Sequence, residues 1–169
     1  DAALSHLNTL QLSQIKLNMK LKVIALIGDI YEIQGHHEKA KKLYETTLEQ
    51  HNDSNHPTLF EIRYFLSDVY FSLANNQAAL HQLNYIENHI DPNTFPYLLA
   101  DTYRQQGQIH FINGQFDSAK RYTQNALQLY TDLGYLAGQI KAYASLSRFL
   151  QHQHRYKEST GYINKALAI

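Results

Sequence analysis

The stretch from residue 21 to residue 40, LKVIALIGDIYEIQGHHEKA, decides the fold, because its pattern returns at residues 100–119 as ADTYRQQGQIHFINGQFDSA. Small residues fall on the same columns in both stretches, namely Gly28 with Gly107, Gly35 with Gly114, and Ala40 with Ala119. A weaker copy lies between these two stretches and another follows them. The last column of the pattern holds Ala40, Ala79, Ala119 and Ser159, which are separated by 39, 40 and 40 residues. The sequence therefore predicts four repeats at a near-constant step.

The residues between these columns have helical spacing. Apolar residues recur every three or four positions, as in the run Ile24, Ile27, Ile30 and Tyr31, and no useful length of the chain alternates as a strand would. The three prolines stand at 57, 92 and 96, in polar runs typical of connectors between helices. We therefore predict an all-α fold of antiparallel helix pairs, with turns near residues 35, 75, 114 and 154.

This pattern resembles the tetratricopeptide repeat, a helix–turn–helix unit that stacks into a right-handed α-solenoid. The first repeat supplies the family's small, aromatic and turn positions in order, as Gly28, Tyr31, Gly35, Ala40, Tyr44 and Thr47. The resemblance extends over residues 20–169 and implies a stacked superhelix of this kind. The step is longer than the standard 34 residues, and this longer form is similar to the repeats of bacterial regulatory and signalling proteins.

The registers define the expected domain organisation. We expect one repeat domain over residues 1–169, with repeats at about 21–52, 58–91, 95–132 and 135–169, and residues 1–17 as the second helix of a preceding repeat. Neither end shows the polar cap that terminal repeats need, so the chain is interpreted as part of a longer protein that can self-associate through its end repeats. Six small residues are expected at buried helix contacts: Gly28, Ala40, Ala79, Gly107, Ala119 and Ala166.

The composition narrows the function further. The chain has 15 Lys and Arg against 15 Asp and Glu, a balance that disfavours a nucleic-acid binder. It has no Cys, which excludes disulfides and thiolate chemistry, and no run of 18 apolar residues, which argues against membrane insertion. A cytoplasmic location is expected, with the periplasm left open.

The resemblance implies that the first helix of each pair lines a concave groove. The columns expected to face it include Lys22, Ala25, Phe65, Asp101, Gln105, Ala144 and His152, and the candidate binding residues are Asp29, Glu32, Glu61, Tyr64, Asp68, Phe71, Arg104, Gln108, Phe111, Lys141, Arg148 and Gln151. Their charges change from acidic to basic along the chain, which favours binding of a protein or peptide segment. The aromatic members are equally compatible with packing between helices.

The sequence gives little support for a carboxylate clamp, a metal site or an enzyme active site. The family's carboxylate clamp is disfavoured, because its columns in the first repeat hold Ala25 and Asp29. The close histidine sets, His36 with His37 and His152 with His154, lie at predicted turns and make no metal site, and no phosphate loop or hydrolase motif occurs. We therefore expect no enzyme activity and no cofactor.

Three functions remain open at this point. The leading hypothesis is a non-catalytic protein- or peptide-binding module that serves as the sensory or interaction part of a larger bacterial regulator. The alternative is a structural spacer or homo-oligomerisation domain with no ligand of its own, although a pure spacer needs no charge graded along its groove. A small-molecule or metal site is the third.

Overall fold

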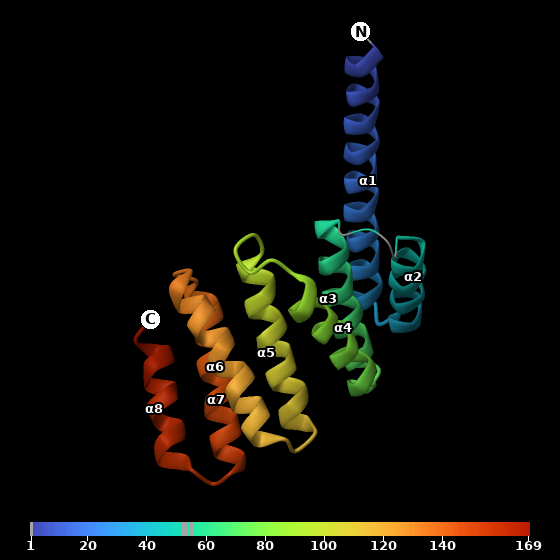
Figure 1. Cartoon of the computed structure of the whole chain (residues 1–169). Helices are drawn as coiled ribbons and strands as arrows, with labels where there is room; N and C mark the ends of the chain where they lie inside the picture. The colour runs from blue at the N-terminus through green and yellow to red at the C-terminus, as the bar shows by residue number, and fades with distance from the viewer. Residues whose placement is uncertain (1, 52–53, 55) are drawn as a thin grey trace. The chain divides into compact units, whose positions relative to one another are not determined.

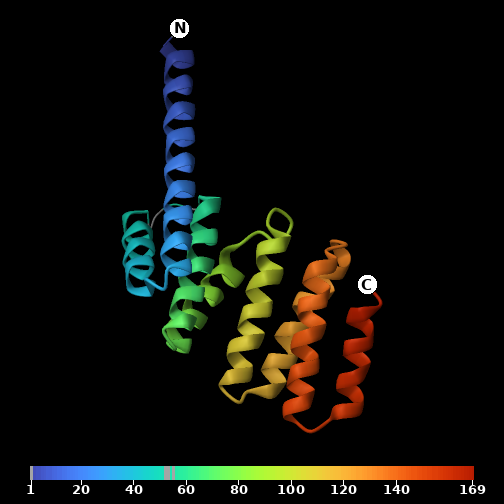
Figure 2. The same ribbon diagram turned by 180° about the vertical axis from the view of Figure 1, so that it is seen from behind.

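The computed structural model describes residues 2–51, 54 and 56–169, and within them the side chains of residues 13, 15–51, 54 and 56–169. The described chain forms eight α-helices and no strand (Figures 1 and 2). They are α1 (Ala2–Ile33), α2 (His37–Gln50), α3 (Pro57–Ser72), α4 (Asn76–His89), α5 (Pro96–Ile112), α6 (Phe116–Asp132), α7 (Leu136–His152) and α8 (Tyr156–Leu167). The predicted all-α class and the antiparallel helix pairs are confirmed.

The helices divide into two compact units. Unit 1 comprises Asp1–Ala79 and unit 2 comprises Leu80–Ile169, so α4 belongs to both. The sequence predicted a single domain over residues 1–169. Repeat arrays divide in this way because each helix pair packs only on its neighbours and no core is shared by the whole chain.

Helix α1 differs from the prediction. A separate helix over residues 1–17 was expected before a first repeat at residue 21, whereas α1 is continuous from Ala2 to Ile33. The segment from Lys16 to Lys20 contains no glycine or proline, and Lys, Leu and Met favour helices, so nothing in it ends the helix. The predicted break is wrong.

The turns within the four pairs lie where the sequence placed them. Each contains one residue with positive φ, and these residues are Gly35 (φ 73°), Ala74 (φ 58°), Gly114 (φ 75°) and His154 (φ 59°). Two of the four positions therefore place a side chain in the left-handed region, which costs about 1–2 kcal/mol for an L-residue.

Replacing Ala74 by glycine is expected to raise the free energy of unfolding of unit 1 by about 0.5–1 kcal/mol. Ala74 is exposed, so the change loses little packing while it removes the left-handed strain. Urea denaturation followed by circular dichroism measures the effect. The reverse substitution, Gly35→Ala, is the control and should destabilise, because Gly35 has φ 73° and its added Cβ meets no atom within 4 Å. If Ala74→Gly fails to stabilise unit 1, or if Gly35→Ala fails to destabilise it, the left-handed strain is contradicted.

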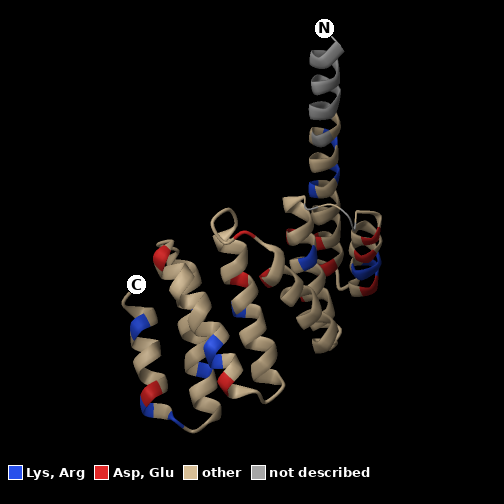
Figure 3. Ribbon diagram, viewed as in Figure 1, with Lys and Arg blue, Asp and Glu red and all other residues tan. Residues whose placement is uncertain are grey.

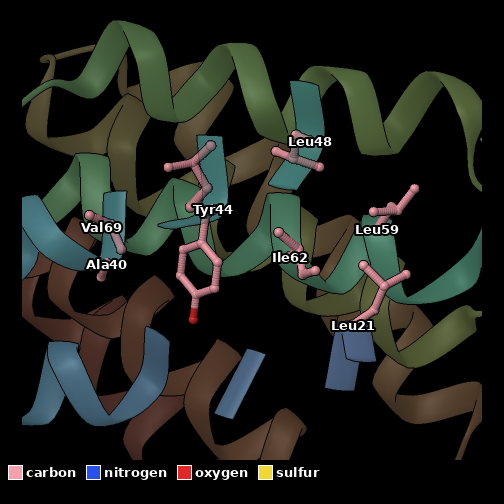
Figure 4. Close-up of a cluster of buried hydrophobic side chains, with 8 residues drawn as sticks. Leu21, Ala40, Tyr44, Leu48, Leu59, Ile62 and Val69 are labelled. Carbon is pink, nitrogen blue, oxygen red and sulfur yellow. The ribbon is translucent and has the colours of Figure 1, made fainter. Parts of the chain in front are cut away.

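The core of unit 1 is built where α1, α2 and α3 meet (Figure 4). Tyr44 is fully buried, and its hydroxyl donates a hydrogen bond of 3.1 Å to the carbonyl of Ala25 on α1. Gly28 makes this approach possible, because an added Cβ would lie 2.1 Å from Cζ of Tyr44. The other buried members of the cluster are Leu21, Ala40, Leu48, Leu59, Ile62, Leu66 and Val69.

A polar contact also joins α2 to α3 in unit 1. The hydroxyl of Tyr70 donates a hydrogen bond to Oε1 of Glu45. Burial, followed by this hydrogen bond and the charge of Glu45, raises the pKa of Tyr70 to about 12. Tyr70 therefore stays a neutral donor at physiological pH.

Unit 2 packs through the same kind of close contact. A Cβ on Gly107 of α5 would lie 2.3 Å from Oγ1 of Thr123 on α6, and one on Gly138 of α7 would lie 2.4 Å from Cδ1 of Tyr130. Ala119 is fully buried beside Leu146 and Phe149. Of the six small residues predicted to be buried, all are except Ala166, which keeps part of its surface exposed. The buried residue of α8 is Ser159, whose Oγ lies 2.8 Å from Oγ of Ser147. Ala166 lies two turns further along the helix, beyond that contact.

Candidate functional site

The first helices of successive pairs lie side by side within each unit, α1 against α3 and α5 against α7. All twelve candidate binding residues stand on these four helices, and each keeps part of its surface exposed. Five are classed as exposed, and the rest are half-buried; the exposed ones are Asp29, Glu61, Lys141, Arg148 and Gln151. We call the α1–α3 set the acidic face and the α5–α7 set the basic face.

Three carboxylates of the acidic face lie close enough to act on one tyrosine. Burial raises the pKa of Tyr44 far above its ordinary value, and the charges of Asp29, Glu32 and Asp68 raise it further. Asp29 and Glu32 belong to α1 and Asp68 to α3, so the two helices direct negative charge to the same region. Figure 3 shows acidic positions along the helices of unit 1.

Glu32 is held in place by the turn that follows α1. Its Oε1 lies 2.8 Å from Nδ1 of His37, the first residue of α2. His36 is next to this contact, with its ring centroid 6.4 Å from that of Tyr31. His37 therefore positions this carboxylate at the start of α2.

The aromatic residues of α3 divide between the core and the acidic face. Phe65 stacks on Tyr44 with ring centroids 6.2 Å apart and an interplanar angle of 26°, and Tyr70 also packs against the core cluster. Tyr64 meets the edge of Phe65 at 6.1 Å. Glu61, Tyr64, Asp68 and Phe71 are three or four residues apart and form one stripe along α3. Phe65, expected beside the groove, is part of the packing instead.

Helix α7 separates its two faces clearly. Lys141, Ala144, Arg148 and Gln151 are all exposed, whereas Ala142, Leu146, Ser147, Phe149 and Leu150 are buried. Lys141 and Arg148 are seven residues apart, two turns along the same side. The expected exposed columns of this helix are thus confirmed, and they carry two positive charges.

Helix α5 carries a charge pair, Asp101 and Arg104, and Tyr130 of α6 contacts it. The hydroxyl of Tyr130 donates a hydrogen bond of 2.6 Å to Oδ1 of Asp101, and Nε of Arg104 lies 3.7 Å from the same oxygen. Burial and then the hydrogen bond to Asp101 raise the pKa of Tyr130, so it remains a donor. Gln105, expected beside the groove, is only 3% exposed and belongs to the interior.

Phe111 is a packing residue. Its ring stacks on Phe149 of α7 with centroids 4.5 Å apart, and it meets Phe116 at 5.7 Å and His152 at 5.3 Å. Helices α5, α6 and α7 all contribute to this aromatic cluster. The sequence left both packing and peptide contact open for Phe111, and the structure places the ring between helices.

Tyr130, Gly138 and a small cavity among α6, α7 and α8 were not predicted from the sequence. Phe116, Leu146, Phe149 and Tyr162 line this cavity of about 90 Å³, with the guanidinium of Arg155 fixed by Glu158 at 2.7 and 2.6 Å. It is well below the 300–1,000 Å³ usual for ligand pockets. Gly138 could have been found from its mid-helix position, whereas the cavity depends on side-chain packing.

The described part of the chain bears on metal binding and on membrane crossing. Among the residues whose side chains are described (13, 15–51, 54 and 56–169), no group of three or more His, Asp or Glu converges as metal ligands would. None of the helices in this part of the chain is both long and apolar enough to cross a membrane.

Comparisons with known proteins agree with this arrangement. The family model described as "Tetratricopeptide repeat" matches residues 21–49. No curated protein sequence matches the chain. The fold is similar to BtubC (BKLC) from P. vanneervenii, with a TM-score of 0.78 and 14% identity over 88% of this chain and 62% of that one. This chain therefore spans less than two thirds of BtubC.

Two further structures show the same fold. A putative kinesin light chain from Podosopora anserina, with nearly identical TPR-like repeats, has a TM-score of 0.74 at 16% identity and covers 88% of this chain and 74% of its own. The MamA protein has a TM-score of 0.66 at 22% identity and covers 88% of this chain and 72% of its own. Residues 21–49 form a tetratricopeptide repeat, and the fold is that of the tetratricopeptide-repeat proteins.

Proposed function

We propose that the chain is a non-catalytic module that binds protein or peptide segments through its acidic and basic faces. Tetratricopeptide repeats generally mediate protein–protein interaction. The observation that carries the proposal is charge segregation along the expected columns. The acidic face has four carboxylates, with Lys22 on the same helices, and the basic face has Arg104, Lys141 and Arg148, with Asp101 on the same helices. Packing does not require this segregation, whereas recognition of charged partners does.

The acidic face suits a basic segment with an apolar side chain. Asp29, Glu61 and Asp68 supply negative charge on two adjacent helices, and Tyr64 and Phe71 offer half-buried rings on the same stripe of α3. Opposite charges increase the encounter rate and orient the partner, while partly desolvated aromatic side chains contribute most of the affinity. We therefore assign the apolar contacts to Tyr64 and Phe71, and leave Phe111 to the interior.

The basic face suits an acidic segment. Lys141 and Arg148 lie on the exposed side of α7 with Gln151, and Gln108 adds an amide on α5. Amide groups can hydrogen-bond the backbone of an extended peptide whatever its sequence. We further propose that these faces act as the interaction part of a larger bacterial regulator in the cytoplasm; in the alternative, a spacer, neither face has a ligand.

Two synthetic peptides test the proposal by fluorescence anisotropy, one rich in lysine and one rich in glutamate, each with a central phenylalanine. Glu61→Lys should lower the affinity for the lysine-rich peptide by on the order of 5–10-fold, and Arg148→Glu should lower the affinity for the glutamate-rich peptide by a similar factor. Both effects should be smaller at high salt. Phe71→Ala should weaken the lysine-rich peptide by about 1–2 kcal/mol.

The matched controls carry the same charge changes on the second helices of the pairs. Glu49→Lys on α2 and Arg121→Glu on α6 alter exposed residues and should leave both affinities within about twofold. If these controls weaken binding as much as Glu61→Lys and Arg148→Glu do, the binding faces are assigned to the wrong helices. If neither peptide binds, the result favours the alternative, a structural spacer or homo-oligomerisation domain with no ligand of its own.

A further inference from the structure

Helix α1 exposes a continuous row of large apolar side chains. The row consists of Met19 (63% exposed), Val23 (52%), Leu26 (63%), Ile30 (52%) and Ile33 (81%). Soluble monomers rarely show contiguous apolar surface of this extent, and such surfaces mark contacts with other molecules. The five residues form what we call the α1 seam.

The spacing of the seam is that of a coiled coil. Its members are four, three, four and three residues apart, the a and d positions of a heptad. Leu21 and Gly28 lie on the opposite side of the helix and are buried in unit 1. Helix α1 therefore has two apolar faces, and the described helices of unit 1 cover one of them.

The seam is already in the conformation that a partner helix needs. Contacts of its buried face with α2 and α3 hold α1 helical, so pairing requires little further ordering of the backbone. The five seam residues belong to neither the acidic face nor the basic face. A helix of matching pattern would fit the seam, and the charges beside it identify which helix.

Charge is distributed unevenly along α1. Lys16, Lys20 and Lys22 come first, followed by Asp29 and Glu32 toward the C-terminal end, and the colours along α1 in Figure 3 follow this order. Lys22 and Asp29 are seven residues apart and stand on the same flank of the seam. Two parallel copies of α1 would bring like charges together at both ends, whereas two antiparallel copies bring each basic half against an acidic half.

We propose that the α1 seam pairs with a second copy of the same chain to form an antiparallel, twofold-symmetric dimer. In the register that pairs a with d positions, Val23 faces Leu26 of the second copy and Met19 faces its Ile30. The same register brings Lys22 close to Asp29 of the second copy, and symmetry repeats the pair. The sequence of α1 thus identifies a second copy of α1 as the partner of the seam.

Sedimentation equilibrium of the full chain tests the dimer. Leu26→Glu places a charge in the middle of the seam and should weaken association by on the order of 100-fold. Because Leu26 is 63% exposed in the single chain, the helical circular-dichroism spectrum should be unchanged. The matched control is Leu167→Glu on α8, where the leucine is 79% exposed, and it should leave the dimer intact.

A charge exchange tests the orientation without touching the apolar residues. Lys22→Asp alone, or Asp29→Lys alone, turns two attractive pairs into two repulsive ones and should weaken the dimer by about 5–10-fold. The double variant, Lys22→Asp with Asp29→Lys, should restore the parent affinity. A monomer at all concentrations overturns the proposal, as does a double variant that associates no better than the single ones. Open-ended oligomers that Leu167→Glu abolishes would overturn it as well, because they indicate head-to-tail contact between different faces.

Discussion

Replacing Tyr44 by alanine is expected to lower the free energy of unfolding of unit 1 by about 3–5 kcal/mol, the range for removing a large aromatic side chain from a core. Tyr44 is fully buried, contacts residues of α1, α2 and α3, and stacks on Phe65. The three helices close around its ring, and they cannot collapse into the space it leaves without moving α2. Urea denaturation of the full chain, followed by circular dichroism, measures the change in the transition of unit 1.

Tyr44→Phe separates the ring from its hydroxyl. This variant keeps the packing and loses the hydrogen bond to the carbonyl of Ala25, so it should cost about 1 kcal/mol. If Tyr44→Ala costs no more than Tyr44→Phe, the ring is not the centre of the core.

The second large effect is expected at the glycine that faces this ring. Gly28→Ala should destabilise unit 1 by about 2–3 kcal/mol, because its Cβ would lie 2.1–2.5 Å from three atoms of Tyr44 and the buried ring has little room to move. The cost exceeds the roughly 1 kcal/mol that alanine gains over glycine in a helix interior. The same unfolding experiment reports it.

Two companion variants identify the cause. In the Tyr44→Ala background, Gly28→Ala should become neutral or stabilising, because the atoms that its Cβ meets are gone. Gly161→Ala on α8 is the matched control in the other unit, since its Cβ meets nothing within 4 Å, and it should stabilise by about 1 kcal/mol. A destabilisation by Gly28→Ala that persists without the Tyr44 ring would point to the backbone of α1 instead.

The fold could be read from the sequence because each repeat imposes the same local requirements. A small residue is needed wherever two helices approach closely. Gly28 and Gly107 meet that need in one column and Ala40 and Ala119 in another, and each pair is 79 residues apart, which is two repeat steps. Left-handed turn positions follow the same columns, even where His154 replaces glycine. The small-residue and turn signals are weak in any one repeat, but they recur in all four. The helix pairs could therefore be predicted.

The continuity of α1 was not predictable from the repeat pattern alone. A repeat register states where a pair begins, but whether the preceding residues end their helix depends on local helix propensity, and residues 16–20 favour continuation. The exposed apolar side of α1 was not predicted either, because its heptad spacing overlaps the columns of the repeat and the same residues fit both patterns.

The candidate site was predicted at the level of helix faces and not of individual rings. Charged columns such as Lys141 and Arg148 had to face water, because burial of an unpaired charge is too costly. Phe111 and Gln105 could satisfy either a groove or an interior. Their positions depend on partners from other helices, Phe149 and His152 for the ring of Phe111, and one helix face cannot reveal those partners.

Backbone amide NMR shifts, recorded while the lysine-rich peptide is added to the full chain, would locate the binding surface directly. We predict that the largest shifts fall on α1 and α3, around Asp29, Glu61 and Phe71, and that they disappear in the Glu61→Lys variant. If the largest shifts instead fall on α2, around Lys42 and Glu49, the assignment of binding to the first helices of the pairs is contradicted.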